Sequence, residues 1–155
     1  MMDEREFEQR ARACRERLFR ICYAFLPDRA DRDDAIQEAL IKAWRKRGTL
    51  RDNTVFEGWL VRIAVNECKT ILRRRKRRPE TELTETIPAA DPFPNSDLRD
   101  ALQRMDIKLR IPIVLHYAEG YTVQETARIL RVPLGTVKHR LAQAKTILQY
   151  ELKEE

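Results

Sequence analysis

The sequence has only four glycines among its 155 residues. Sheets of short strands need tight turns, in which glycine is the usual residue, so this scarcity disfavours a β fold. The abundant Leu, Ala, Arg, Glu and Lys favour helices instead. No segment reaches the roughly 18 consecutive apolar residues of a membrane span, and the charged N-terminus has no apolar core for a signal peptide. We therefore expect an all-α, cytoplasmic protein that does not insert into a membrane.

Cysteine is also scarce, with Cys14, Cys22 and Cys68 the only three. They form no CxxC pair and lack the spacing to histidine that zinc ligands show. They are predicted to be reduced and mostly buried. No second ligand accompanies His139 or His116, so we expect neither a metal nor another cofactor.

Lysine and arginine are absent from one stretch, residues 79–97, although the chain as a whole carries a net charge of +6. This stretch holds four of the seven prolines and five acidic residues. Proline removes backbone donors, and few large apolar groups are present, so neither a helix nor a core is expected there. The pattern predicts a flexible linker between two small helical domains, residues 1–78 and 98–155. The positive charge makes a polyanion a predicted partner.

Apolar residues at helical spacing predict three helices in the first domain. The first covers residues 7–26 and ends at Pro27, the second starts at an N-cap on Asp31, and the third covers residues 55–75. One face of the third helix carries a polar stripe with steps of four, three and four residues. Six consecutive basic residues, 73–78, follow it. A solvated charged face is the plainer interpretation, but an unbroken basic run repels itself unless negative charge lies nearby.

In the second domain we expect a short helix near residues 98–105 and a helix over residues 107–117 that starts at an Asp106 N-cap. Pro112 is predicted to bend or shorten this helix because it deletes a backbone hydrogen bond. Gly120 closes the segment.

A helix-turn-helix is predicted over residues 122–149. Thr122 and Glu125 have the spacing of a capping box, which starts a helix to about Leu130, and Pro133 and Gly135 mark the turn. The second helix buries Val137, Leu141, Ala144 and Leu148. It presents polar side chains outward near its N-terminus: Thr136, Lys138, His139, Arg140 and Gln143. Such a helix fits the major groove, with donors near base edges and phosphates. The alternative is an ordinary helical hairpin with a basic surface.

Taken together, the two halves resemble the extracytoplasmic-function (ECF) group of bacterial RNA polymerase sigma factors. The matching segments are residues 33–44, 56–66 with the basic run at 73–78, 116–120 and 133–141. Response regulators carry a similar helix-turn-helix, but both blocks in this order with a short acidic linker are far more specific. The chain departs from the family pattern at five positions: Asp106 and Pro112 around the expected helix, Thr126 in place of a large aliphatic residue, Arg131 in place of glycine, and His139 in place of serine.

The resemblance implies a sigma factor that binds core RNA polymerase, recognises the −35 and −10 promoter elements and promotes transcription initiation. Region 2 would be residues 1–78 and region 4 residues 98–155. The beta-prime clamp helices of polymerase would contact Asp33, Asp34, Gln37, Glu38 and Ile41. The single strand of the −10 element would contact Arg51, Asp52, Asn53, Thr54, Arg62, Asn66, Lys69 and Arg73. The −35 duplex would contact the five outward residues of the helix-turn-helix. The beta flap and an anti-sigma factor are further candidate partners, and Trp44 and Trp59 are expected in the core.

Two other functions remain open at this point. A helix-turn-helix regulator that never joins polymerase would leave the block at residues 31–78 unexplained. A nuclease would have to bind a metal through Asp33, Asp34 and Glu38, but no histidine or second carboxylate cluster converges on them. We therefore expect no catalytic site.

Overall fold

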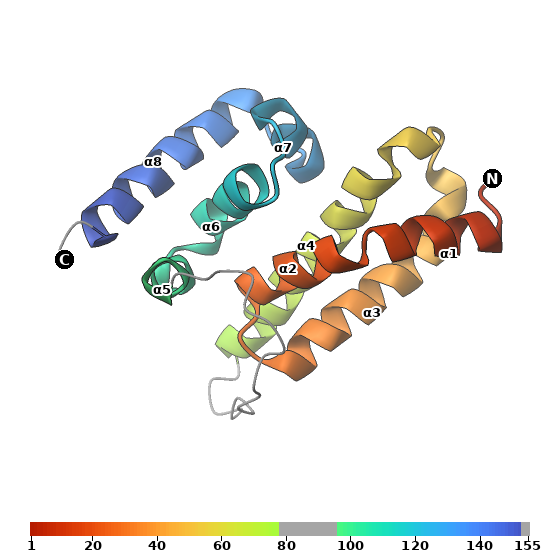
Figure 1. Cartoon of the computed structure of the whole chain (residues 1–155), viewed down its shortest axis with the longest axis horizontal. Helices are drawn as coiled ribbons and strands as arrows, with labels where there is room; N and C mark the ends of the chain where they lie inside the picture. Colours follow the sequence, from red (N-terminus) through yellow and green to blue (C-terminus); the bar gives the residue numbers. More distant parts are fainter. Residues whose placement is uncertain (78–95, 153–155) are drawn as a thin grey trace. The chain divides into compact units, whose positions relative to one another are not determined.

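The computed structural model describes residues 1–77 and 96–152, which are helices and short connections with no strand among them (Figure 1). The chain divides into two compact units, Met1–Ile87 and Pro88–Glu155. The all-α, two-domain fold class is therefore confirmed. Nearly all of the predicted linker at 79–97 lies outside the described residues, so its boundaries stay a prediction. No helix in the described part of the chain is both long and apolar enough to cross a membrane.

Over residues 1–77 the first unit has four α-helices, with two short 3-10 turns between the last two. They are α1 (Glu4–Ala13), α2 (Arg15–Phe25), α3 (Arg29–Lys46), η1 (Arg47–Thr49), η2 (Asn53–Val55) and α4 (Phe56–Arg77). Helix α2 packs on α3 and α4, which also pack on each other. The large side chains that lose all solvent contact here are Leu18, Ile21, Tyr23, Phe25, Leu26, Leu60, Val61 and Val65. Their burial supplies the main favourable term for folding this unit.

The predicted continuous helix at 7–26 is wrong, because the chain breaks at Cys14 into α1 and α2. Cys14 leaves the regular helical geometry at ψ −3°, and its amide donates to the Ala11 carbonyl at 3.1 Å. The break lets the two halves follow different partners. In α1, the Phe7 ring packs edge-on against the rings of Trp44 and Phe56, at centroid distances of 5.3 and 5.7 Å. No glycine or proline marks this position, so the sequence carries no local signal for it.

The predicted N-cap at Asp31 is also wrong, since α3 begins at Arg29 with Asp28 as its N-cap. Asp28 follows Pro27 in an extended conformation, and its carboxylate accepts from the Ala30 amide at 3.1 Å. Asp31 instead lies in the first turn of the helix, where its negative charge interacts favourably with the positive end of the helix dipole.

In each unit a buried arginine donates hydrogen bonds to backbone carbonyls where one helix ends and the next begins. In the first, Arg32 donates from Nη1 to the carbonyls of Leu26 (3.0 Å) and Pro27 (2.9 Å), while its guanidinium lies over the Tyr23 ring. In the second, Arg110 donates to the Met105 carbonyl at 2.9 Å, and burial lowers its pKa. Each arginine satisfies carbonyl groups that a helix end would otherwise leave unpaired.

Over residues 96–152 the second unit has four α-helices and one π-helical turn. They are α5 (Ser96–Arg104), α6 (Ile107–Ile113), η3 (Val114–Ala118), α7 (Val123–Leu130) and α8 (Leu134–Leu152). Helix α8 packs on α5, α6 and α7. Helix α5 begins two residues before the expected Leu98. The Asp106 N-cap is confirmed, because its side chain accepts from the Lys108 amide at 3.1 Å.

Pro112 shortens α6, as its missing backbone donor predicts. The α-helix ends one residue later, at Ile113, and the chain widens into the π-turn η3. Pro112 itself is buried. The chain then turns at Gly120, whose φ of +78° suits glycine.

Both tryptophans belong to the first unit and are half-buried. The Arg47 guanidinium lies 3.5 Å above the centre of the Trp44 ring. The Trp59 ring packs against Phe56, with a centroid distance of 5.9 Å. Both indoles therefore contact neighbouring side chains within the fold, but neither is fully buried, so the expected core position is met only in part.

Candidate nucleic-acid interface

The helix-turn-helix begins at a capping box. The Glu125 amide donates to Thr122 Oγ1 at 3.0 Å, and the Thr122 amide donates to Glu125 Oε1 at 2.9 Å. Two free donors at the start of α7 are thus satisfied. Thr126, which departs from the family pattern, is fully buried, and its hydroxyl donates to the Thr122 carbonyl at 2.8 Å. The predicted capping box is therefore confirmed, and the unusual threonine leaves no unpaired hydroxyl.

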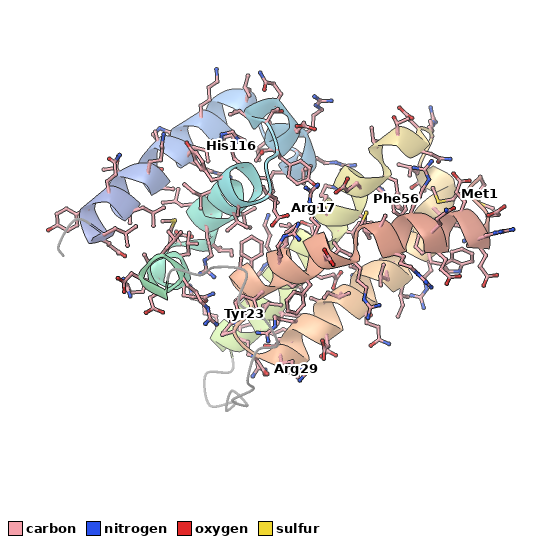
Figure 2. All side chains as sticks on the ribbon, viewed as in Figure 1. Met1, Arg17, Tyr23, Arg29, Phe56 and His116 are labelled. Atoms are coloured by element: carbon pink, nitrogen blue, oxygen red, sulfur yellow. The ribbon has the colours of Figure 1, made fainter. Side chains whose placement is uncertain are left out.

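His116 holds the turn that leads into this motif (Figure 2). Its Nδ1 lies 2.6 Å from the Tyr121 carbonyl oxygen, and a carbonyl can only accept, so Nδ1 carries the hydrogen. In parallel, the Tyr121 amide donates to the Leu115 carbonyl at 3.1 Å. These two contacts bridge Gly120 and fix where α7 starts. The histidine therefore supports the turn between η3 and α7.

The turn between α7 and α8 is a regular helix-ending motif with an unusual residue in it. The Val132 amide donates to the Ala127 carbonyl at 3.1 Å, and the Arg131 amide donates to the Arg128 carbonyl at 3.3 Å. This pair of bonds requires a left-handed residue between them. Arg131 takes that conformation, with φ 55° and ψ 46°. The turn therefore forms with arginine in the place where glycine was expected.

Helix α8 carries the five predicted −35 residues close to its N-terminus. Lys138, His139 and Gln143 are exposed, while Thr136 and Arg140 are half-buried. The opposite stripe of the helix buries Val137, Leu141 and Ala144. One detail of the prediction is wrong. Gly135 is the second residue of α8 and not part of the turn, because the Pro133 carbonyl already accepts from the Thr136 and Val137 amides.

The polar stripe on α4 lies where the sequence predicts it, on one face of a continuous helix. Asn66 and Arg73 are exposed, and Arg62 and Lys69 are half-buried. The opposite face buries Leu60, Val61, Ala64, Val65, Cys68 and Ile71. The stripe therefore presents cationic and amide groups from a rigid support.

Three of the four predicted residues of the loop before α4 make contacts that hold its shape. Asp52 accepts from the Thr54 side chain at 2.7 Å and from its amide at 3.0 Å, and these bonds lower the pKa of the Asp52 carboxyl. Asn53 is half-buried, and its amide donates to Glu6 Oε1 at 3.3 Å. Arg51 is exposed. Arg51 is therefore the cation that this loop exposes to solvent.

One member of the basic run at the end of α4 is turned inward. Arg75 donates from Nε and Nη2 to the two carboxylate oxygens of Asp31 (2.8 and 2.9 Å), and Nη2 also donates to Asp28 (2.8 Å). Its neighbours Arg73, Arg74, Lys76 and Arg77 are exposed. The basic run by itself does not show which of its cations meets the two aspartates at the start of α3.

The predicted polymerase-binding residues lie on one side of α3. Asp33, Asp34 and Gln37 are exposed, Glu38 is half-buried, and Ile41 is a large apolar side chain with 37% of its surface exposed. Beside this face runs a groove of about 780 Å³, whose walls come from α1, α2 and α3. Its apolar lining includes Phe7, Phe19, Ile36, Leu40 and Trp44, and Asp33 and Gln37 also line it.

No group of three or more His, Cys, Asp or Glu side chains in the described segments is arranged to hold a metal ion. The nuclease hypothesis, which required metal binding at Asp33, Asp34 and Glu38, therefore finds no support in the geometry. What the site offers is exposed donors on α4 and α8 and an acidic, partly apolar face on α3. Together with the helix-turn-helix, this defines a two-domain, DNA-binding transcription factor.

Comparison with known proteins narrows this class. The family model of Sigma-70 region 2 matches residues 11–78, and that of Sigma-70 region 4 matches residues 96–148. The ECF RNA polymerase sigma factor SigM of Mycobacterium tuberculosis is 35% identical over 150 residues, which are 94% of this chain and 76% of the relative. SigW of Bacillus subtilis is 28% identical over 161 residues, which are 90% of this chain and 85% of the relative. The chain belongs to the ECF RNA polymerase sigma factors, which are transcription initiation factors and not enzymes.

Two solved structures share the fold. One is the sigma factor RpoE in complex with the anti-sigma factor NepR from Bartonella quintana, with a TM-score of 0.80 and 24% identity, covering 96% of this chain and 98% of that one. The other is CnrH in complex with the cytosolic domain of CnrY, with a TM-score of 0.77 and 24% identity, covering 99% of this chain and 91% of that one.

Proposed function

We propose that this sigma factor acts in the cytoplasm without catalytic groups of its own, and that its promoter contacts are divided between α4 and α8. The observation that carries the proposal is the pairing, in one chain, of a helix-turn-helix with a cationic helix face in a separate unit. A regulator that never joins polymerase has no use for the second surface.

Helix α8 would read the −35 element as duplex DNA. Lys138 and His139 are exposed in its second turn, and Thr136, Arg140 and Gln143 accompany them. Donors at the start of such a helix reach base edges and phosphates in the major groove. The capping box and the His116 contact support this role because they fix the direction in which α7 enters the motif.

The stripe on α4 would hold the unpaired strand of the −10 element. Single strands are bound by cations that follow the phosphates and by polar groups that contact bases. Arg62, Lys69 and Arg73 supply charge along one face, Asn66 supplies an amide between them, and Arg51 adds a cation from the preceding loop. Asp52, Asn53 and Thr54 would act there mainly by shaping the loop.

The face of α3 would dock on the beta-prime clamp helices of core polymerase. Its exposed carboxylates, Asp33 and Asp34, suit a basic partner, and Ile41 adds an apolar contact that a purely solvated face would not need. Gln37 and Glu38 complete this surface.

A second contact with polymerase would use the second unit. A groove of about 450 Å³ there is mostly apolar, and its lining includes Leu98, Leu102, Ile113, Val114, Tyr117 and Leu148. An amphipathic helix fits such a groove, and the beta flap is the occupant that we propose. One structural neighbour is a sigma factor bound to the anti-sigma factor NepR, so an anti-sigma factor is a further proposed partner.

Binding to core polymerase is the decisive test. The purified chain is expected to be retained by core enzyme and to direct run-off transcription from members of a promoter library. Changing Asp33 and Asp34 together to Ala should abolish retention, whereas Glu16→Ala, at an exposed acidic residue of α2, should not. A chain that binds duplex DNA but never binds core enzyme would contradict the proposal and restore the regulator hypothesis.

A further inference from the structure

Arg131 adopts a backbone conformation that an arginine would not choose. It is the one non-glycine residue with positive φ in the parts of the chain that the structure describes. A side chain in the left-handed region is strained, and glycine would form the same turn without that strain. The turn is held by backbone bonds from Arg131 and Val132, to which an arginine side chain adds nothing.

The Arg131 side chain is also without an internal role. It is exposed, and within the described residues its guanidinium makes no hydrogen bond or ion pair. A strained residue that does not stabilise the fold is a reason to look for function. The location of Arg131 in the helix-turn-helix indicates which function that is.

Arg131 lies at the entrance of the helix that we assign to the −35 duplex. It is three residues ahead of Leu134, the first residue of α8, and it follows Arg128, an exposed cation in the last turn of α7. When the first turns of α8 enter a major groove, the segment just before them lies at the rim of the groove. The DNA groups at that rim are phosphates.

We propose that Arg131 is an additional phosphate-binding residue for duplex DNA, held at the groove rim by its left-handed backbone. This inference rests on the proposed role of α8. A guanidinium suits the position because its planar donors can bind a phosphate through two hydrogen bonds. The contact carries no sequence information; it adds affinity and fixes how the helix-turn-helix sits on the duplex.

One alternative explanation is local. A cation near the C-terminus of α7 interacts favourably with the helix dipole, so arginine could stabilise the helix end instead of binding DNA. The two explanations predict opposite results when the charge is removed and the backbone strain is relieved. The dipole explanation predicts a lower thermal midpoint with unchanged DNA affinity. The phosphate explanation predicts weaker binding without a loss of thermal stability.

The test measures binding of the full chain to a short DNA duplex at several KCl concentrations. The duplex has a random sequence because phosphate contacts dominate sequence-independent binding. Arg131→Asn and Arg131→Gly are expected to weaken binding about threefold to tenfold. They should also reduce the salt slope by about one. Both variants should unfold at the wild-type temperature or above it. Arg131→Lys keeps the charge and should retain most of the affinity.

Two controls separate the possible failures. Arg5→Asn, at an exposed cation of α1, makes the same change in net charge and should leave binding unchanged. Lys138→Ala should weaken binding through α8 itself. If Lys138→Ala weakens binding and Arg131→Asn does not, the inference about Arg131 is wrong. If neither variant weakens binding, the proposed role of α8 is wrong, and the inference about Arg131 loses its basis.

Discussion

The guanidinium of Arg75 donates two hydrogen bonds to Asp31, one to each carboxylate oxygen. These bonds join the end of α4 to the first turn of α3. The same guanidinium reaches the buried carboxylate of Asp28, the N-cap of α3. Within a run of exposed cations, one arginine is thus committed to the fold.

Removing this contact should cost stability. In a double-mutant cycle, Arg75→Ala and Asp31→Ala should show a coupling of about 1 kcal/mol, because the pair is only partly buried and solvent screens it. Urea unfolding followed by circular dichroism measures the coupling. Arg74→Ala, at the exposed neighbour, should change the free energy of unfolding by less than about 0.5 kcal/mol. A coupling near zero would mean that water replaces the contact at no cost.

Substitutions in the two helices that we propose bind DNA, α4 and α8, should impair different steps. Lys138→Ala or Arg140→Ala should weaken duplex binding and lower its salt dependence, because each loses a cation near the phosphates. Asn66→Ala or Lys69→Ala should leave duplex binding through the second unit intact and impair promoter opening. Gel-shift titration measures the first effect, and permanganate reactivity of unpaired thymines measures the second. The same defect at the same step for both pairs would refute the division of labour.

The hydrogen bond from His116 to the Tyr121 carbonyl should support the start of the helix-turn-helix. His116→Ala is expected to cost about 1 kcal/mol of stability, since the carbonyl loses its side-chain donor. His116→Asn places an amide nitrogen close to the position of Nδ1 and should recover part of that loss. Thermal unfolding compares the three proteins. Equal losses for Asn and Ala would show that ring packing against Tyr117 matters, and not the hydrogen bond.

Cys14 should make stability fall at high pH. Burial and, to a smaller extent, Glu57 raise the pKa of its thiol from 9.0 to about 11, while Arg17 opposes the shift. Because the folded state holds this proton more tightly, the contribution is fully present below pH 9 and is lost as the pH rises towards 11. Unfolding free energies of wild type and Cys14→Ala should therefore converge across that range. Parallel curves would mean that the thiol has the same pKa in both states.

Local signals in the sequence were sufficient for much of the second unit. The capping box at Thr122, the N-cap at Asp106 and the shortening at Pro112 each depend on residues within a single turn. Such signals act before any tertiary contact forms, so a sequence can reveal them. The outward face of α8 followed in the same way from the spacing of Val137 and Leu141.

Most features that the sequence did not reveal depend on partners far along the chain. The break at Cys14 serves the packing of Phe7 on Trp44 and Phe56. The N-cap bond at Asp28 is local, to the Ala30 amide, but Asp31 offers the same local signal, and the contact of Asp28 with Arg75 spans 47 residues. Periodicity places residues on a helix face, but it does not show which cation of a basic run turns inward to meet a carboxylate.

The placement of both tryptophans in the first unit gives the protein a built-in optical reporter. Indole emission depends on the surroundings of Trp44, under the Arg47 guanidinium, and of Trp59, beside Phe56. Tyr117, Tyr121 and Tyr150 belong to the second unit, which holds no indole. Excitation at the red edge of protein absorption therefore reports on the first unit alone. Melting, quenching or ligand titration of that unit can then be recorded in the intact protein without a dye or a truncation.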